Sequence, residues 1–323
     1  MANKKKLSVC CITYNQEDYI EKALEGFVKQ IVGFEIEILI HDDASTDGTA
    51  KIIKKFERNY PNLFKVIYSK NNIYSQGQSP INKLLKMSSG DYIAFCEGDD
   101  FWIDYYKLNK PVESLESNNE YIATYHNVRV IDQHGNVFMK EQNSFPLYKT
   151  HDVYLNEIKS GRLCGQLASL VCKNIWKTWE KEKMDTFFSY KLNDDVKISS
   201  LMVFLGKVLF FEDIMACYRR TYVGDSWNAQ MHEKNLTNHY IDANEELNRL
   251  YSEFFKINRG DYTVNAMLYA FKFFCKTPNL ENWNFFIKTI KISNNKIKNI
   301  SYLFYRIFDI IIPLRKNSWE KLN

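Results

Sequence analysis

The chain has 323 residues, of which 45% are hydrophobic and 25% charged, proportions typical of a globular protein of about two domains. Its 43 Lys and Arg exceed its 39 Asp and Glu by only four, so no chain-wide basic surface is available for binding nucleic acid. The same composition excludes fibrous and low-complexity proteins.

The cysteines indicate a reduced environment. There are seven, without a C-x-x-C pair, and most lie in apolar runs. We expect buried free thiols in a cytoplasmic protein rather than disulfides or a zinc site. The apolar stretch near the start is too short for a signal peptide, and the most apolar window, 300–314, is interrupted by Arg306 and Asp309. Neither secretion nor a membrane-spanning helix is expected.

Short apolar runs alternate with helical patterns over the first hundred residues. Strands are expected at 7–12, 34–40, 65–68 and 92–96, and helices at 20–28, 50–60 and 81–87. This alternation is typical of βαβ units, so it predicts an α/β fold with a mostly parallel sheet.

The remaining sequence is mixed and then helical. We expect a helix at 108–115, a strand at 121–131, a hairpin turn at 133–136 and an amphipathic helix from Asn193 to Leu205. Helices at 247–255, 266–274 and 283–290 follow. The pattern predicts a first domain of residues 1–225 and a helical region of residues 226–323.

Three polar clusters follow predicted strands, where open α/β sheets bind ligands. They are Thr13-Tyr14-Asn15, residues 42–49 and Glu97-Gly98-Asp99-Asp100. Carboxylates without nearby Cys or His suit Mg²⁺ or Mn²⁺ bound partly through substrate phosphates, which makes Asp99 the first candidate metal ligand and Asp100 the second. Asp42 and Asp43 could instead accept hydrogen bonds from a base or ribose. One such turn alone would more simply cap a helix.

Common alternatives lack their motifs. The chain has no P-loop, no G-x-G-x-x-G and no H-E-x-x-H sequence, and its six histidines share no ligand spacing. These absences argue against an ATPase, a dinucleotide-binding enzyme and a zinc protease.

Segments 8–15, 38–49 and 90–100 resemble, in order and spacing, the family 2 glycosyltransferases of the GT-A fold. The resemblance is strongest before residue 130 and fainter up to Trp227. It implies a Rossmann-like nucleotide-binding half at 1–100 and an acceptor half at 101–225. The nucleotide-binding residues that it implies are Thr13, Tyr14, Asn15, Asp42, Asp43, Asn72 and Glu97. Glu97-Gly98-Asp99 stands where the family usually has Asp-x-Asp, and Asp99 keeps the metal role.

The acceptor-site motif of the family is similar to Asn193-Asp194-Asp195 followed by Tyr218-Arg219. By this resemblance Asp194 is the catalytic base and Asp195 the alternative, while either residue could simply cap the following helix. Thr221 replaces a histidine that is often present in relatives. Trp227, after this segment, is the aromatic residue most worth considering for stacking on a sugar.

The resemblance implies an inverting, metal-dependent transferase that moves a sugar from a nucleotide diphosphate, UDP foremost, to an acceptor hydroxyl. The acceptor would be a saccharide or lipid-linked saccharide of bacterial surface polysaccharide or glycolipid assembly. Two alternatives remain. A sugar-nucleotide nucleotidyltransferase would need a glycine-rich basic loop after the first strand, where this chain has Thr-Tyr-Asn-Gln-Glu-Asp. A receiver-like Mg²⁺-binding signalling domain would be much shorter.

The last part of the chain carries an amphipathic pattern. Apolar residues from Ile300 to Leu314 share one helical face, and basic residues surround it. This pattern predicts peripheral contact of residues 296–316 with the inner face of the cell membrane. Docking on the catalytic domain or on a second copy in a homo-oligomer is the alternative.

Overall fold

The computed structural model describes residues 5–143, 145–159, 163–221, 237–259 and 278–292, together with 267, 270, 271, 274, 275, 300 and 301. The chain divides into two compact units, Met1–Ala229 and Gln230–Asn323. The expected boundary near residue 225, like Trp227, lies outside the described residues.

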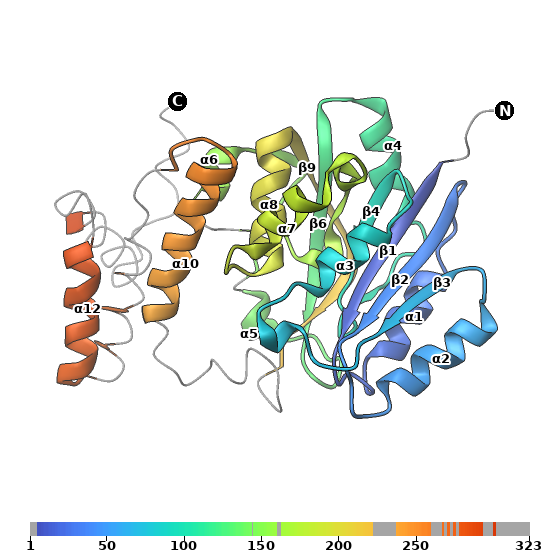
Figure 1. The fold of residues 1–323 in the computed structure, drawn as a ribbon, viewed down its shortest axis with the longest axis horizontal. Helices are drawn as coiled ribbons and strands as arrows, with labels where there is room; N and C mark the ends of the chain where they lie inside the picture. Colours follow the sequence, from blue (N-terminus) through green and yellow to red (C-terminus); the bar gives the residue numbers. More distant parts are fainter. Residues whose placement is uncertain are drawn as a thin grey trace. The chain divides into compact units, whose positions relative to one another are not determined.

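Strands of the first unit form one mixed sheet (Figure 1). Within the described residues it has nine strands in the order β3-β2-β1-β4-β8-β6-β9-β5, and β7 also pairs with β9. The strands are β1 Lys6–Thr13, β2 Glu35–Asp42, β3 Phe64–Tyr68, β4 Tyr92–Phe95, β5 Phe101–Trp102, β6 Tyr121–Ile131, β7 His151–Val153, β8 Val171–Lys173 and β9 Lys207–Arg219. The neighbouring strands β3, β2, β1 and β4 are parallel, and β8 runs antiparallel to β4 and β6. The predicted α/β class is confirmed.

Helices connect and cover these strands. They are α1 Ile20–Val28, α2 Thr49–Asn59, α3 Pro80–Met87, α4 Asn109–Ser117, α5 Met139–Gln142, α6 Leu155–Ile158, α7 Lys181–Ser189 and α8 Asp194–Leu205, with short 3-10 turns at Tyr74–Gln76, Leu167–Ser169 and Ile175–Thr178. The ends predicted for the first hundred residues differ from these by only a residue or two, because the apolar spacing there matches the buried faces.

The core explains why these patterns are so clear. In α1 the residues spaced three and four apart, Ile20, Ala23, Leu24 and Phe27, are all buried. The ring of Phe27 packs edge-on against Trp102, with centroids 4.7 Å apart. Helix α1 therefore packs against the sheet through this apolar face.

Helix α8 differs from its prediction. The sequence predicts an amphipathic helix here, but seven consecutive residues, from Lys197 to Val203, are buried. Contacts with α6, α7, β6 and β9 bury the helix on several sides, so its polar residues Lys197, Ser199 and Ser200 lie inside the protein. The prediction of an amphipathic helix was wrong for this reason.

In the second unit all described secondary-structure elements are helical. They are α10 Thr237–Arg249, a π-turn at Leu250–Phe254 and α12 Leu280–Ile292, with a small apolar cluster of Met267, Ala270 and Phe286. Of the predicted membrane-contact segment 296–316, only Ile300 and Ser301 are described, so that prediction lies outside the described residues. No helix in the described part is long and apolar enough to cross a bilayer.

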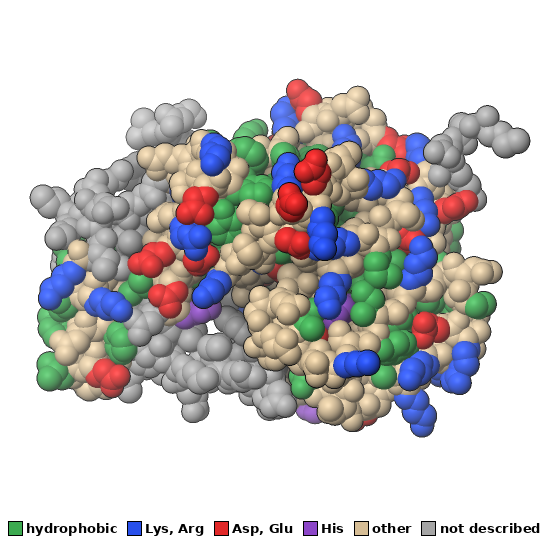
Figure 2. Space-filling view, viewed as in Figure 1, with side chains coloured by type: hydrophobic (Ala, Val, Ile, Leu, Met, Phe, Trp, Pro, Cys, Tyr) green, Lys and Arg blue, Asp and Glu red, His purple; other side chains and the backbone are tan. Residues whose placement is uncertain are grey.

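The state of the cysteines and the distribution of surface charge are those expected from the composition. All seven cysteines are free, six of them are buried, and Cys275 is exposed. On the face of the first unit in Figure 2, basic and acidic side chains are interspersed rather than separated by sign. This mixture is expected for a chain of net charge +4.

Candidate active site

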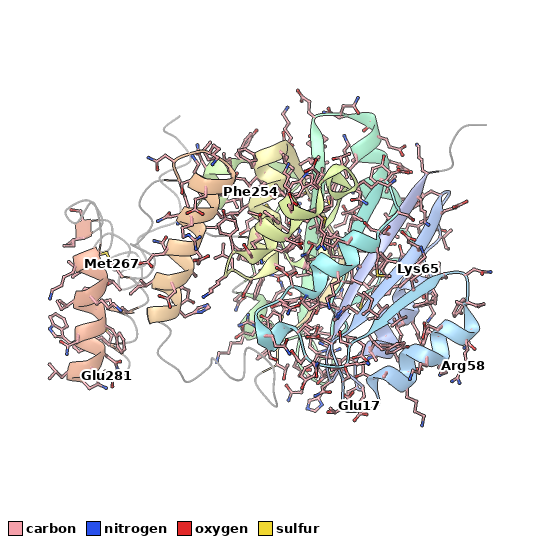
Figure 3. The ribbon with its side chains drawn as sticks, viewed as in Figure 1. Glu17, Arg58, Lys65, Phe254, Met267 and Glu281 are labelled. Atoms are coloured by element: carbon pink, nitrogen blue, oxygen red, sulfur yellow. The ribbon has the colours of Figure 1, made fainter. Side chains whose placement is uncertain are left out.

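Parallel pairing brings the three polar clusters to one edge of the sheet. Thr13, the last residue of β1, pairs in register with Asp42, the last residue of β2. The backbone N–H of Asp43 donates to Thr13 O at 3.0 Å, and that of Gly98 donates to Ile12 O at 3.0 Å. Glu17, labelled in Figure 3, lies just beyond these strand ends. The clusters converge as the sequence predicted.

The loops after β1 and β2 hold each other in place. Asn15 has a left-handed backbone with φ of 50°, and its Oδ1 accepts the N–H of Thr46 at 2.8 Å. The N–H of Asn15 donates to Ser45 Oγ at 2.9 Å, and Asp42 Oδ1 accepts the N–H of Ser45 at 3.1 Å. Asn15 and Asp42 therefore shape the predicted nucleotide pocket through its backbone.

Asp43 positions a third loop. Its two carboxylate oxygens accept the N–H groups of Ile73 at 2.8 Å and Tyr74 at 2.9 Å, and the residue is only 3% exposed. Asn72, at the start of this loop, accepts the N–H of Ser75 at 2.7 Å. The segment that contains the predicted nucleotide-binding residue Asn72 is thus held against the strand ends. Tyr14, 41% exposed, is the predicted nucleotide residue most open to a ligand.

Gly98 allows the acidic strand end to approach the β1–α1 loop. A Cβ at this position would lie 2.5 Å from Gln16 Oε1 and 2.8 Å from Thr13 Oγ1. Gln16 accepts a hydrogen bond from Thr13 at 2.7 Å, and its side chain acts to lower the pKa of Asp99. A side chain at 98 would collide with both Gln16 and Thr13.

Four carboxylates influence one another here. Burial, Asp99, Asp195 and Asp194 together raise the pKa of Glu97 to about 8. Burial also raises the pKa of Asp99, although Arg219 and Gln16 oppose that shift. Since like charges oppose each other's ionisation, this cluster is suited to bind a cation.

The two predicted metal ligands have different surroundings. Asp100 is 2% exposed, its Oδ1 accepts the N–H of Arg219 at 2.8 Å, and its Oδ2 has no hydrogen-bond partner. Asp99 and Glu97 are only partly buried. The described residues contain no group of three or more His, Cys, Asp or Glu arranged around a common metal position. Two carboxylates still fit Mg²⁺ or Mn²⁺, because these ions take many of their ligands from phosphates and water.

Asp194 and Asp195 both lie in the first turn of α8 but are bonded differently. Asp194 Oδ2 accepts the hydroxyl of Ser79 at 2.5 Å, and its Oδ1 pairs with Lys197 Nζ at 2.7 Å. Asp195 Oδ1 accepts the N–H of Val196 at 2.7 Å, and its Oδ2 has no partner among the described residues. Burial raises the pKa of Asp195 to about 6. Asp195, the alternative in the sequence, thus has the freer oxygen.

Several residues in this region could not be recognised from sequence. Ser79 and Lys197 engage Asp194, and Gln16 supports Asp99. Tyr19 stacks under the guanidinium of Arg219, with 4.2 Å between its ring centre and Cζ. Ser79 did carry one signal, since a serine directly before Pro80 is a common helix start.

Comparison with known proteins agrees with this arrangement. Residues 8–175, just over half of the chain, match the model of glycosyl transferase family 2. An uncharacterized protein of Mycobacterium tuberculosis is 43% identical over 129 residues, which are 40% of this chain and 37% of that protein. The poly(ribitol-phosphate) beta-N-acetylglucosaminyltransferase TarS of Staphylococcus aureus is 36% identical over 122 residues, which are 38% of this chain and 19% of TarS. The alignments thus span much less than the full length of these relatives.

Solved structures share the fold. TarS residues 1–349 in complex with UDP-GlcNAc gives a TM-score of 0.58 at 18% identity, covering 88% of this chain and 79% of that one. Mannosyltransferase PcManGT from Pyrobaculum calidifontis, in complex with GDP-Man and Mn²⁺, gives 0.50 at 13% identity, covering 99% and 89%. The fold is of the GT-A type, with its polar residues gathered at the strand ends. The chain belongs to glycosyl transferase family 2.

Proposed function

We propose that this chain is an inverting glycosyltransferase that moves a sugar from a UDP-sugar to an acceptor hydroxyl in bacterial surface polysaccharide or glycolipid assembly. The observation that carries the proposal is the carboxylate cluster at the strand ends. There Glu97 and Asp99 provide charge for a cation, and Asp195 keeps one oxygen free beside them.

The donor would lie across the ends of β1, β2 and β4. Thr13 and Asn15 shape one wall, Asp43 holds the loop that follows β3, and Tyr14 is exposed toward ligands. UDP is the preferred nucleotide because TarS, similar in both sequence and fold, was solved with UDP-GlcNAc. Glu97 and Asp99 would hold Mg²⁺ or Mn²⁺, which supplies positive charge to the diphosphate when bound.

Asp195 would act as the general base. Its free Oδ2 takes the proton of the acceptor hydroxyl while that oxygen forms a bond to the anomeric carbon. The bond between that carbon and the diphosphate oxygen breaks at the same time, so the electron pair leaves with the nucleoside diphosphate and the anomeric configuration inverts. Asp194, paired with Lys197 and Ser79, instead fixes the first turn of α8.

The test compares two variants in one assay. Release of UDP from a panel of UDP-sugars is measured with Mn²⁺ and candidate saccharide acceptors. Asp195→Asn should lower transfer by about 10²–10⁴-fold while UDP affinity stays unchanged, because base assistance has this magnitude. Asp194→Asn should keep a larger part of the activity. Full activity of Asp195→Asn would refute the assignment of Asp195 as the base. Full activity of both variants would show that the base does not lie in α8.

A further inference from the structure

A polar pocket lies beside the carboxylate cluster and is used by no step described above. Its volume is about 440 Å³, within the range of small-molecule sites. Three parts of the first unit line it: the start of α1, the turn after β6 and the end of β9. The lining residues are Asp18, Tyr19, Lys22, Gln133, His134 and Arg219.

Arg219 is the most firmly held residue of this pocket. It is 3% exposed, and its Nε donates to Asp99 O at 2.9 Å while Nη1 donates to Asp132 O at 2.8 Å and Gln133 O at 3.2 Å. Its Nη2 makes no hydrogen bond to the described residues. The guanidinium therefore keeps a spare donor at the wall of the pocket, which a bound ligand can use.

The chemistry of the lining favours a polyhydroxyl ligand over a simple anion. Arg219, Lys22 and the Gln133 amide can donate hydrogen bonds, whereas Asp18 and the Gln133 carbonyl can accept them. A sugar hydroxyl does both, so it can satisfy both kinds of partner. The carboxylate of Asp18 would repel a phosphate placed in the same space.

The position of the pocket separates its ligand from the nucleoside. Predicted nucleotide residues follow β1, β2, β3 and β4, and none of them lines the pocket. The pocket shares with them only the segment after β1, through the start of α1, and its other walls are the turn after β6 and the end of β9. The bond from Arg219 Nε to Asp99 O joins this pocket to the carboxylate cluster. A ligand in the pocket would therefore lie next to the reaction centre but outside the nucleoside site.

We propose that this pocket binds a sugar residue of the acceptor, at a subsite distinct from the reacting hydroxyl. This assignment rests on the proposed glycosyltransferase activity. It predicts that acceptors of two or more sugar units bind better than single sugars, since the pocket would hold one unit while another reacts.

The test uses the full chain saturated with UDP and Mn²⁺. Methyl glycosides of glucose, galactose, mannose, rhamnose and N-acetylglucosamine are titrated while saturation-transfer NMR is recorded. We expect at least one to bind, and Asp18→Ala and Lys22→Ala each to raise its Kd about five- to tenfold, the effect of losing one hydrogen bond. Asp18 and Lys22 are both exposed, so neither change threatens folding.

Matched controls and a separate readout keep the outcomes distinct. Glu113→Ala and Lys51→Ala remove exposed charges elsewhere and should leave the Kd unchanged. Unchanged UDP affinity in every variant shows that the nucleotide site is intact. Normal UDP binding without any glycoside binding that depends on Asp18 and Lys22 would overturn the subsite alone. Inorganic phosphate binding that depends on Lys22 would likewise overturn it by making the pocket an anion site. Absence of UDP binding would instead refute the proposed function.

Discussion

Asp194 and Asp195 are adjacent in sequence and differ in what surrounds each carboxylate. Asp194 has a cation and a hydroxyl on its two oxygens, whereas Asp195 accepts one backbone N–H. Lys197 and Ser79 make this difference, and the second of these comes from a distant part of the chain. The proposal of Asp195 as the base therefore depends on which carboxylate has an oxygen without a partner, and not on charge alone.

The pH dependence of transfer follows from the environment of Asp195. Burial raises its pKa to about 6, so the carboxylate form that the proposed base requires is lost as the pH falls through that value. We expect kcat/KM to be constant above pH 7 and to fall about tenfold per unit well below pH 6. Because the charge of Asp194 also raises this pKa, Asp194→Asn should move the inflection to lower pH. An inflection that stays in place would contradict this coupling.

Asp99 is the proposed metal ligand whose substitution gives the clearest test. Asp99→Asn replaces a charged oxygen ligand by a neutral one, so we expect a large loss of Mn²⁺-dependent UDP affinity and a small change without metal. Calorimetric titration of UDP with and without Mn²⁺ measures both. Asp100→Asn is the comparison, because Asp100 is buried against the N–H of Arg219 and should act mainly on stability. Equal affinities of Asp99→Asn and the parent protein with Mn²⁺ would rule out this ligand.

Among the elements, the parallel strands were the most predictable. The apolar runs of β1, β2 and β4 are largely buried, so the pattern in the sequence marks both the strand and the edge where its polar residues gather. Helix α8 was less predictable because neighbouring elements bury its polar residues as well. Lys107 is similar: it is fully buried, with its Nζ 4.5 Å from the Trp102 ring centre, and burial lowers its pKa to about 7. No local pattern distinguishes such a lysine from a surface one.

In the candidate site, too, local sequence patterns do not show contacts between distant residues. The sequence located the acidic clusters, since each follows a strand. It ranked Asp194 above Asp195 for the role of base, whereas the function proposed above prefers Asp195. That ranking depends on Ser79, which belongs to the start of α3 and reaches Asp194 only in the folded chain. The polar pocket at Arg219 was also not predictable, because its walls come from three separate elements.

Strand β2 contains a buried carboxylate with several polar partners. Glu37 is 2% exposed and accepts hydrogen bonds from Ser8 Oγ at 2.6 Å and from the N–H of Ser89 at 2.7 Å. It also pairs with Lys65 at 2.8 Å and Lys6 at 3.0 Å. Burial alone would raise the pKa of Glu37, but these partners hold it well below its ordinary value.

We expect Glu37→Gln to lower the free energy of unfolding by about 2–4 kcal/mol at pH 7, because it leaves buried donors and two lysines without their charged partner. A depressed pKa stabilises the fold above the ordinary glutamate pKa of about 4.3, and this contribution is lost as the pH falls. The difference between variant and parent should therefore shrink at low pH. Urea titrations at several pH values measure it, with exposed Glu113→Gln as the control. A constant difference would contradict the assigned cause.

For the whole molecule, the division into two units separates the proposed chemistry from the C-terminal part. Every residue placed in the site lies between Thr13 and Arg219, within the first unit. The second unit carries no residue used in the proposed mechanism. Changes at the end of the chain should therefore leave donor chemistry intact.

Removal of the residues after Asn295 tests the membrane prediction for 296–316. We expect the full chain to sediment with anionic liposomes, since basic residues beside an apolar face add roughly 1 kcal/mol each near such a surface. The shortened chain should stay in solution and hydrolyse UDP-sugar at the rate of the full chain. Sedimentation of the shortened chain, or none by the full chain, would show that this segment has a structural role.

The distribution of cysteines has a practical consequence for following this protein by spectroscopy. Six thiols are buried in the first unit, and burial raises their pKa values, so they are poor nucleophiles toward maleimides. Cys275 is exposed and belongs to the second unit. A maleimide dye should therefore label the native protein once, at Cys275, which peptide mass spectrometry can verify. The natural sequence thus provides a reporter on the second unit without any engineered substitution.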